Sequence, residues 1–203
     1  MLDSARLTSV SNVEALCYIS DCDHSYDGIE LDAKVVRGPR LVFSDLWNAL
    51  IPYATGDIYM QCSDDVVFRT HAWDVEVENA FASVPDRIVL VHADDGGGND
   101  PCFAEFPFVS REWVNAVGYF TGPGFVADFS DAWPNDVADM IGRKIYLPHV
   151  LIEHMHHVWG KAPLDKTYEE NNARYREGRP DLRYQETLPQ RLADAEKLRK
   201  VMR

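Results

Sequence analysis

The chain has 203 residues, of which 46% are hydrophobic and 26% charged, enough apolar material for one domain with its own core. A formal net charge of −13 argues against a broad phosphate-binding surface, while leaving room for a small local basic patch. No apolar run approaches the roughly 18 residues of a membrane span, and the opening Met1-Leu2-Asp3 lacks a secretory signal pattern. We therefore expect a cytoplasmic protein that does not enter a membrane.

Apolar runs and turn residues alternate along the chain in a pattern that predicts strands and helices in turn. The expected strands, in chain order, are 13–20, 34–37, 57–62, 88–91, 144–148 and 150–154. The expected helices are 2–12, 44–50, 74–82, 113–117 and 132–141. This alternation predicts an α/β fold with a mostly parallel central sheet flanked by helices. In such sheets, ligands bind at the carboxyl ends of the strands.

Two adjacent carboxylates, Asp64 and Asp65, follow the apolar strand 57–62 and precede a second apolar run. Unpaired carboxylates in an apolar setting are costly, and the usual remedy is a divalent cation. Carboxylate oxygens suit hard cations such as Mg²⁺ or Mn²⁺. The alternative is a solvated turn that carries two acids. A second acidic turn, 21–23, also follows a strand, so both turns are expected at the same edge of the sheet.

A cluster of histidines follows the last expected strand, in the segment Ile152-Glu153-His154-Met155-His156-His157. Side chains two apart on a strand share a face, so His154 and His156 would point the same way. Imidazoles can join carboxylates in a mixed metal site, and the alternative is a set of surface or core histidines. One ion at the strand end reaches one of the two easily, and His156 is favoured because it lies nearer that end.

Several segments in order resemble the nucleotide-diphosphate half of glycosyltransferases with the GT-A fold, a Rossmann-like α/β fold. They are Leu46-Trp47-Asn48-Ala49, then Ala54-Thr55-Gly56-Asp57-Ile58, then Ser63-Asp64-Asp65-Val66-Val67-Phe68, and then Trp73. The resemblance runs from about Val13 to about Tyr168, and is greatest to the small glycosyltransferases of phages and bacteria. This chain differs in starting inside what resembles the family's first helix, so the usual first strand is expected to be missing.

The resemblance implies a nucleotide site. The acidic turn after the first strand, at Asp21 or Asp23, would receive the uracil or ribose of a UDP-sugar. The helix that carries Asn48 would lie beside the nucleotide. Because Ser63 stands at the first acidic position of the family's metal motif, Asp64 would contact the ribose or a metal-bound water.

The resemblance also implies a metal shell and a catalytic base. Asp65 would be the main ligand to Mn²⁺ or Mg²⁺, and His154 or His156 would complete the shell. Asp131 lies where the family places an acidic residue near the acceptor, so it is the candidate base; the alternative is an N-cap for the following helix. The loop 94–100, which contains three consecutive glycines, would close over the donor or admit the acceptor.

The chain is divided here into a catalytic domain, residues 1–168, and a charged helical extension, residues 169–203. The segment 165–168 resembles a family tail that packs back near the site. Beyond Tyr175, the charge pattern indicates a solvated helix or an arm that docks on another subunit of a homo-oligomer, the alternative being a frayed tail. Truncation after Arg179 is therefore expected to leave nucleotide binding intact.

The function that follows is a metal-dependent transfer of a sugar from a nucleoside-diphosphate sugar to an acceptor hydroxyl. The acceptor would be a hydroxymethylated DNA base, a virion protein or a glycan, and the acidic net charge favours the last two. A phage enzyme of this kind would act in the host cytoplasm. The alternatives are a catalytically inactive nucleotide-binding or assembly module, and a nucleotide-sugar hydrolase in which water is the acceptor.

Overall fold

The computed structural model describes residues 1–97, 102–164 and 166–203. The strands are β1 (Leu16–Ser20), β2 (Lys34–Gly38), β3 (Ile58–Met60), β4 (Val66–Phe68), β5 (Leu90–Asp94), β6 (Phe108–Ser110) and β7 (Lys144–His154). The α-helices are α1 (Leu2–Thr8), α2 (Phe43–Leu50), α3 (Trp73–Ala82), α4 (Arg111–Val117), α5 (Ala132–Ile141), α6 (Lys166–Gly178), α7 (Pro180–Glu186) and α8 (Leu188–Val201). Short 3₁₀ helices span Ile51–Tyr53 and His157–Trp159.

The strands form two separate sheets within the described residues. One has the order β3-β6-β5-β7-β4, and the other pairs β1 with β2 in parallel. The α/β class agrees with the sequence prediction, but the mostly parallel sheet is wrong for the larger sheet, where only β5 and β7 run in parallel. A parallel neighbour needs a long crossover, usually a helix. β5 instead returns to β6 through residues 95–107, whose described part holds no helix, so these strands pair antiparallel.

The last two expected strands are one strand, β7. Its register against β5 shifts between the pairs Ala93–Leu147 and Asp94–Leu151, so three residues of β7 have no partner on β5. Pro148, which has no N–H to donate, lies in this irregular stretch. The strand then resumes its pairing and ends at His154.

The larger sheet buries apolar side chains on both faces, as the run Ile88-Val89-Leu90-Val91 requires. Val89 and Val91 face a cluster with α1 and α3 that includes Phe68, Trp73, Phe81 and Ile152. Ile88 and Leu90 face the opposite cluster, which includes Trp113 of α4, Trp133 and Val137 of α5, and Leu198 of α8. Period-two alternation along one strand therefore joins the two halves of the core.

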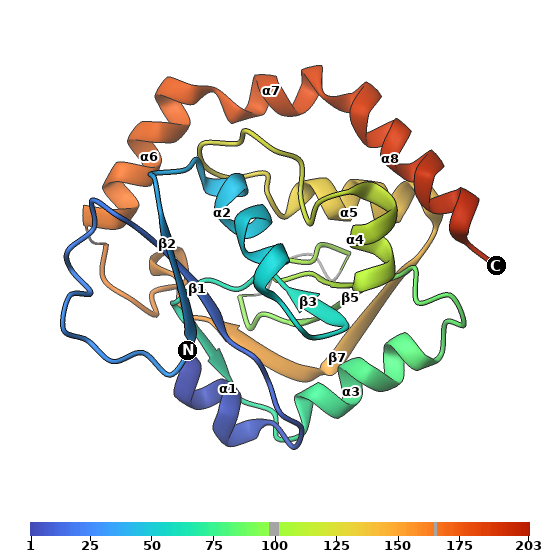
Figure 1. Cartoon of the computed structure of the whole chain (residues 1–203), viewed down its shortest axis with the longest axis horizontal. Coiled ribbons are helices and arrows are strands. Elements are labelled where there is room, and N and C mark those ends of the chain that lie inside the picture. Colours follow the sequence, from blue (N-terminus) through green and yellow to red (C-terminus); the bar gives the residue numbers. More distant parts are fainter. Residues whose placement is uncertain (98–101, 165) are drawn as a thin grey trace.

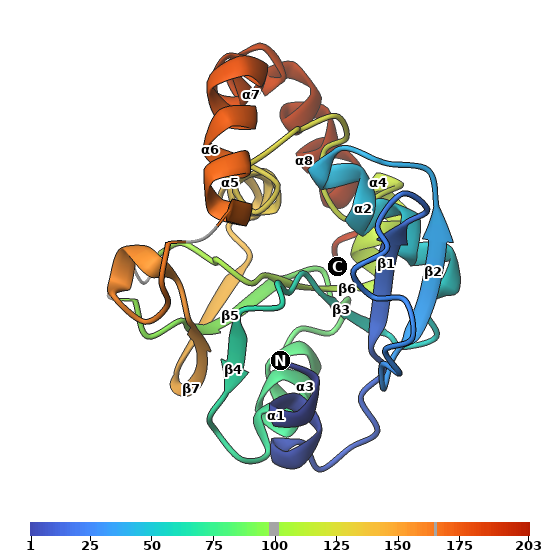
Figure 2. The same cartoon turned by 90° about the vertical axis from the view of Figure 1, so that its left-hand side faces the viewer.

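The C-terminal helices form an arc on the side of the molecule opposite α1 and α3 (Figures 1 and 2). α8 packs into the core, since Ala195 and Leu198 are fully buried. The buried Asp194 carboxylate accepts hydrogen bonds from Tyr119 Oη and, at 3.2 Å, from Trp133 Nε1. The expectation of a solvated or frayed end is therefore wrong for residues 188–201, and truncation after Arg179 would expose core. The domain boundary at residue 168 stays a prediction.

None of the helices in the described residues is both long and apolar enough to cross a membrane.

Packing of α8 predicts a large difference between two leucines on the same helix. Leu198→Ala should lower the free energy of unfolding by about 2–5 kcal/mol, because it leaves a cavity in the core. Leu192→Ala, at a side chain that is 49% exposed, should change it by less than about 0.5 kcal/mol. Urea unfolding followed by circular dichroism measures both. Equal effects would show that α8 does not pack on the core in solution.

Candidate active site

Asp65 and His154 meet at one edge of the larger sheet because β4 pairs antiparallel with β7. Val66, the first residue of β4, lies opposite His154, the last residue of β7. The N–H of Met155 donates to the carbonyl of Asp65 at 2.8 Å and extends this register by one pair. The carboxyl end of β5 lies alongside, since the His154 N–H donates to the carbonyl of Asp95 at 2.9 Å.

His154 lies between two carboxylates. Its Nε2 is 3.2 Å from Asp65 Oδ2, and its Nδ1 is 3.2 Å from Glu105 Oε1. The residue is only 8% exposed, and burial alone would lower the pKa of an imidazole. The contacts with the two carboxylates outweigh that effect and raise the pKa of His154 to about 9. The imidazole is therefore protonated at neutral pH in the metal-free protein.

The Asp65 carboxylate is held by three side chains. Burial would raise its pKa, but hydrogen bonds from His154, Ser63 and Tyr168 hold the pKa well below its usual range. Ser63 Oγ donates to Oδ1 at 2.6 Å, and Tyr168 Oη donates to Oδ2 at 2.7 Å. Ser63 thus helps to orient the Asp65 carboxylate.

Tyr168 brings the start of α6 to the site. The Tyr168 ring also packs on His156 and His157, whose ring centroids lie 4.7 and 4.2 Å from its own. The prediction that the segment 165–168 packs back near the site is confirmed at Tyr168, whereas Asp165 lies outside the described residues.

The structure places His154, and not the preferred His156, against Asp65. The strand ends at His154, so the period-two argument does not extend to His156. His156 is half-buried, its ring centroid lies 4.9 Å from that of His154, and its Nδ1 accepts a hydrogen bond from the Val158 N–H at 3.3 Å. His156 is therefore next to the pair, and as a metal ligand it stays a prediction.

Asp131 is the N-cap of α5, as its alternative interpretation predicted. Its Oδ1 accepts a hydrogen bond from the Ala132 N–H at 2.8 Å. Burial, followed by the negative charge of Glu105, raises the pKa of Asp131 to about 7. Asp128, three residues earlier, also has a raised pKa, mainly through burial. A carboxyl whose pKa lies near neutrality can both accept and release a proton at physiological pH.

The acidic turn after β1 lies close to Asp64. Burial, together with the charges of Asp64 and Asp23, raises the pKa of Tyr26, a residue of that turn. Asp23 is held in place, since it accepts hydrogen bonds from the Ser25 N–H at 3.0 Å and from Ser25 Oγ at 2.6 Å. Asp64 and Asp21 are exposed. The two acidic turns are thus neighbours, but they follow strands of different sheets, so the expectation that they share an edge of one sheet is wrong.

Asn48 has a different set of contacts. Its Oδ1 accepts hydrogen bonds from the N–H groups of Phe120 and Thr121 at 3.0 and 3.2 Å, and its Nδ2 donates to the Thr121 carbonyl at 2.9 Å. Both ends of the amide therefore tie α2 to the loop after α4. Its role beside the nucleotide stays a prediction, and its present role is structural.

Glu105 is a site residue that sequence reasoning missed. It lies between the glycine-rich loop, whose residues 98–101 are outside the described part, and β6. The only signal was a charge beside the apolar Phe106-Pro107. A small pocket of about 190 Å³ opens next to it, lined by Glu105, His154, His156, Val158 and Trp159. Val158 is 65% exposed and Trp159 40%, so this apolar wall faces solvent.

The donor atoms at Asp65 and His154 fit a divalent cation. Two neighbouring ligands with bonds of about 2.1 Å to one ion lie roughly 3.0 Å apart. The observed 3.2 Å between Asp65 Oδ2 and His154 Nε2 is close to that value. Glu105, behind Nδ1, occupies the place of a carboxylate that orients a metal-bound histidine. The described residues hold no group of three or more His, Cys, Asp or Glu side chains arranged as a ready-made metal site, so other ligands would be needed.

Comparison with solved structures found a mannosyltransferase from Pyrobaculum calidifontis, determined in complex with GDP-mannose and Mn²⁺. The sequences are 16% identical and the TM-score is 0.46. The match covers 80% of this chain and 56% of that one, so the chain spans little more than half the length of the mannosyltransferase. No model of a protein family and no curated protein matches the sequence.

The raised pKa of His154 predicts how stability depends on pH. The group binds its proton more tightly in the folded state, so its contribution is complete below about pH 6.5 and is lost as the pH rises toward 9. The free energy of unfolding, measured with urea and a chelator present, should therefore fall between pH 6.5 and 9, and His154→Gln should flatten that fall. His149→Gln, which removes an exposed histidine paired with Glu76, is the control and should keep it. An unchanged slope in His154→Gln would contradict the ion-pair assignment.

Proposed function

We propose that this chain is a metal-dependent glycosyltransferase that moves a sugar from a nucleoside-diphosphate sugar to an acceptor hydroxyl. The observation that carries the proposal is the meeting of Asp65 with His154 at the sheet edge. Two further groups support it: the acidic turn beside Asp64, and Asp131 with a pKa near neutrality.

In this proposal Asp65 and His154 hold one Mn²⁺ or Mg²⁺, and the diphosphate and water supply the remaining ligands. The bound cation would offset the negative charge that develops on the diphosphate leaving group. His154 must lose its proton to bind a metal, because a protonated imidazole has no lone pair to offer. Glu105 keeps the ring oriented through Nδ1, and Ser63 and Tyr168 keep the Asp65 carboxylate aimed at the site.

In this proposal the nucleoside would lie between the acidic turn of residues 21–26 and Asp64. Hydroxyl groups of a ribose suit carboxylate acceptors, and the charges of Asp23 and Asp64 both help to raise the pKa of Tyr26, so both carboxylates lie near it. Tyr26 is half-buried and offers a ring on which a base can stack. Uracil stays the predicted base.

Asp131 is proposed as the base that takes the proton from the acceptor hydroxyl. Glu105 connects it to the metal pair, since Glu105 contacts His154 and its charge also raises the pKa of Asp131. The pocket of about 190 Å³ lies on this side, and its exposed Trp159 gives an apolar ring against which a sugar could pack. A glycan or a glycosylated protein is the acceptor class that this wall and the acidic charge favour.

Donor binding should depend on metal and on His154. Calorimetry of UDP, with GDP as the comparison, should show binding in Mn²⁺ that weakens at least tenfold in chelator. Asp65→Asn and His154→Gln should each weaken the Mn²⁺-dependent binding tenfold or more, because each removes one ligand. Asp57→Asn, at an exposed carboxylate paired with Arg111, is the matched control and should bind normally. Binding that is unaffected by chelator would refute the metal role, and no binding of either nucleotide would refute the proposal.

Asp131→Asn should separate binding from chemistry. The variant should bind UDP and Mn²⁺ as the parent does, while slow hydrolysis of UDP-sugars falls by about 10²- to 10⁴-fold, the usual contribution of a general base. Asp128→Asn is the control for general effects of charge near the site. Hydrolysis that dominates even when glycan acceptors are supplied would favour a nucleotide-sugar hydrolase. Binding without turnover of any donor would favour an inactive nucleotide-binding module.

A further inference from the structure

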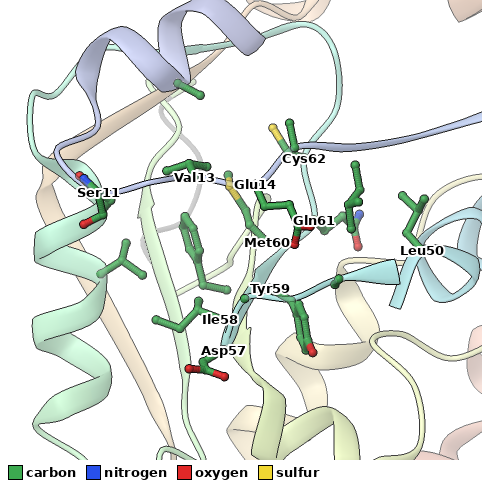
Figure 3. Close-up of a pocket in the computed structure, with 18 of the residues that line it drawn as sticks. Ser11, Val13, Glu14, Leu50, Asp57, Ile58, Tyr59, Met60, Gln61 and Cys62 are labelled. Carbon is green, nitrogen blue, oxygen red and sulfur yellow. The ribbon is translucent and has the colours of Figure 1, made fainter. Parts of the chain in front are cut away.

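An apolar cavity of about 590 Å³ separates the two sheets. It is lined from one side by residues 11–16, which lead into β1, and from the other by β3 and the residues that flank it. Figure 3 shows Val13 and Glu14 on a segment that crosses beside β3, whose residues Ile58, Tyr59 and Met60 also line the cavity. Figure 2 shows β1 and β2 standing apart from the larger sheet. Neither Asp65 nor His154 lines the cavity.

β3 turns an unpaired backbone edge toward this cavity. The Arg111 N–H donates to the Asp57 carbonyl and the Gln61 N–H to the Pro107 carbonyl, and Tyr59 lies opposite Val109. In an antiparallel pair alternate residues bond to the same neighbour, so residues 57, 59 and 61 bond toward β6. The N–H and carbonyl groups of Ile58 and Met60 therefore point away from β6. These residues are half-buried, and the described part of the chain gives their backbone groups no partner.

β1 offers the complementary edge. The Lys34 N–H donates to the Ala15 carbonyl and the Asp21 N–H to the Gly38 carbonyl, so the odd-numbered residues of β1 bond toward β2. The backbone groups of Leu16 therefore point away from β2, and Leu16 lines the cavity. At one end of the gap, the Glu14 carboxylate accepts hydrogen bonds from the Thr55 N–H and Oγ1 and holds the two sides together.

Two buried side-chain atoms near the cavity also lack hydrogen-bond partners among the described residues. Gln61 is 7% exposed and lines the cavity, and its Oε1 has no partner among the described residues. The buried Trp47 Nε1, which belongs to another lining residue, also lacks one there. Buried polar groups without partners cost free energy. A ligand that carries hydrogen-bond donors and acceptors would remove that cost here.

We propose that the cavity accepts an extended peptide segment of a partner chain, which inserts as a β-strand between β1 and β3 and joins the two sheets. Alternate residues of an extended peptide present their N–H and carbonyl groups to opposite edges. One edge could therefore bond to Leu16, and the other to Ile58 and Met60. A small apolar molecule would fill the volume but leave both backbone edges unpaired.

Charge indicates the chemistry of that segment. Among the residues that line the cavity, the carboxylates of Glu14, Asp57, Asp74 and Glu78 outnumber two cations, Arg6 and the amino terminus of Met1. Asp57 and Glu78 are also paired with Arg111 and Arg87. The whole chain has a net charge of −13. The segment that fits is therefore a run of four or five apolar residues, rich in Val and Ile, with Lys or Arg on its flanks.

The test begins with a phage-displayed library of random eight-residue linear peptides, panned against the full chain. Selected peptides should show an apolar centre with basic flanks. When the synthetic peptide binds, hydrogen exchange at the amides of Leu16, Ile58 and Met60 should slow at least tenfold. A library that yields no specific binder overturns the proposal, as does a binder that leaves these amides unprotected.

Backbone methylation of the selected peptide distinguishes insertion from other modes. N-methyl groups at the even positions block one peptide edge, and at the odd positions the other. An inserted strand uses both edges, so each methylated peptide should bind at least tenfold more weakly. If only one methylated peptide binds more weakly, the peptide adds to a single edge. If neither binds more weakly, the peptide binds through its side chains. Both results contradict insertion.

A protein variant gives an independent check. Met60→Pro removes an N–H that faces the cavity and leaves the bonds to β6 in place, since proline is tolerated on such an edge. It should weaken peptide binding at least tenfold, whereas Met60→Leu, which keeps the N–H, should stay within twofold. Equal binding by a folded Met60→Pro and Met60→Leu would overturn the proposal. If Met60→Pro does not fold, the methylated peptides still decide.

Discussion

The antiparallel pairing of β4 with β7 is the constraint on which the site depends. It sets Val66 opposite His154, and this one register brings a carboxylate from the start of one strand against an imidazole from the end of the other, 89 residues away along the chain. A slip of one residue would turn His154 to the opposite face of the sheet and leave Asp65 without its partner. The buried residues Val66 and Ile152 fix the register, because a slip would also expose them.

The position of His154 between two carboxylates links structure to chemistry. Without metal, the protonated imidazole of His154 lies within ion-pair distance of Asp65 through Nε2 and of Glu105 through Nδ1. In the proposed function, that proton would have to leave before a metal could bind the ring nitrogen. The surrounding contacts from Ser63 and Tyr168 hold the carboxylate in place in the metal-free state. The site is therefore preorganised, which reduces the cost of binding.

Local patterns in the sequence predicted most of the elements and part of the site. The helix 132–141 with Gly142 after it matches α5, and the acidic pair Asp64-Asp65 does follow a strand. These features depend on nearest neighbours, such as the Asp131 cap and the left-handed conformation of Gly142. The proximity of the turn 21–26 to Asp64 did not follow from the strand-end rule, because β1 and β3 belong to different sheets.

Features that depend on distant pairing could not be predicted. The direction of β6 depends on how residues 95–107 return along β5, which no local pattern records. The choice between His154 and His156 depended on where β7 stops, and Glu105 entered the site only through a loop. The burial of α8 was missed because charged residues dominate its sequence, and two of its four buried residues, Arg191 and Asp194, are themselves charged.

The central claim is that the His154 imidazole is a metal ligand beside Asp65. The most direct measurement is pulsed electron paramagnetic resonance of Mn²⁺ bound with UDP to protein whose histidines carry ¹⁵N. The account predicts a ¹⁵N hyperfine coupling from one directly bound imidazole, present in the parent and in His156→Gln and absent in His154→Gln. No ¹⁵N coupling in the parent, or a coupling that survives in His154→Gln, would contradict it.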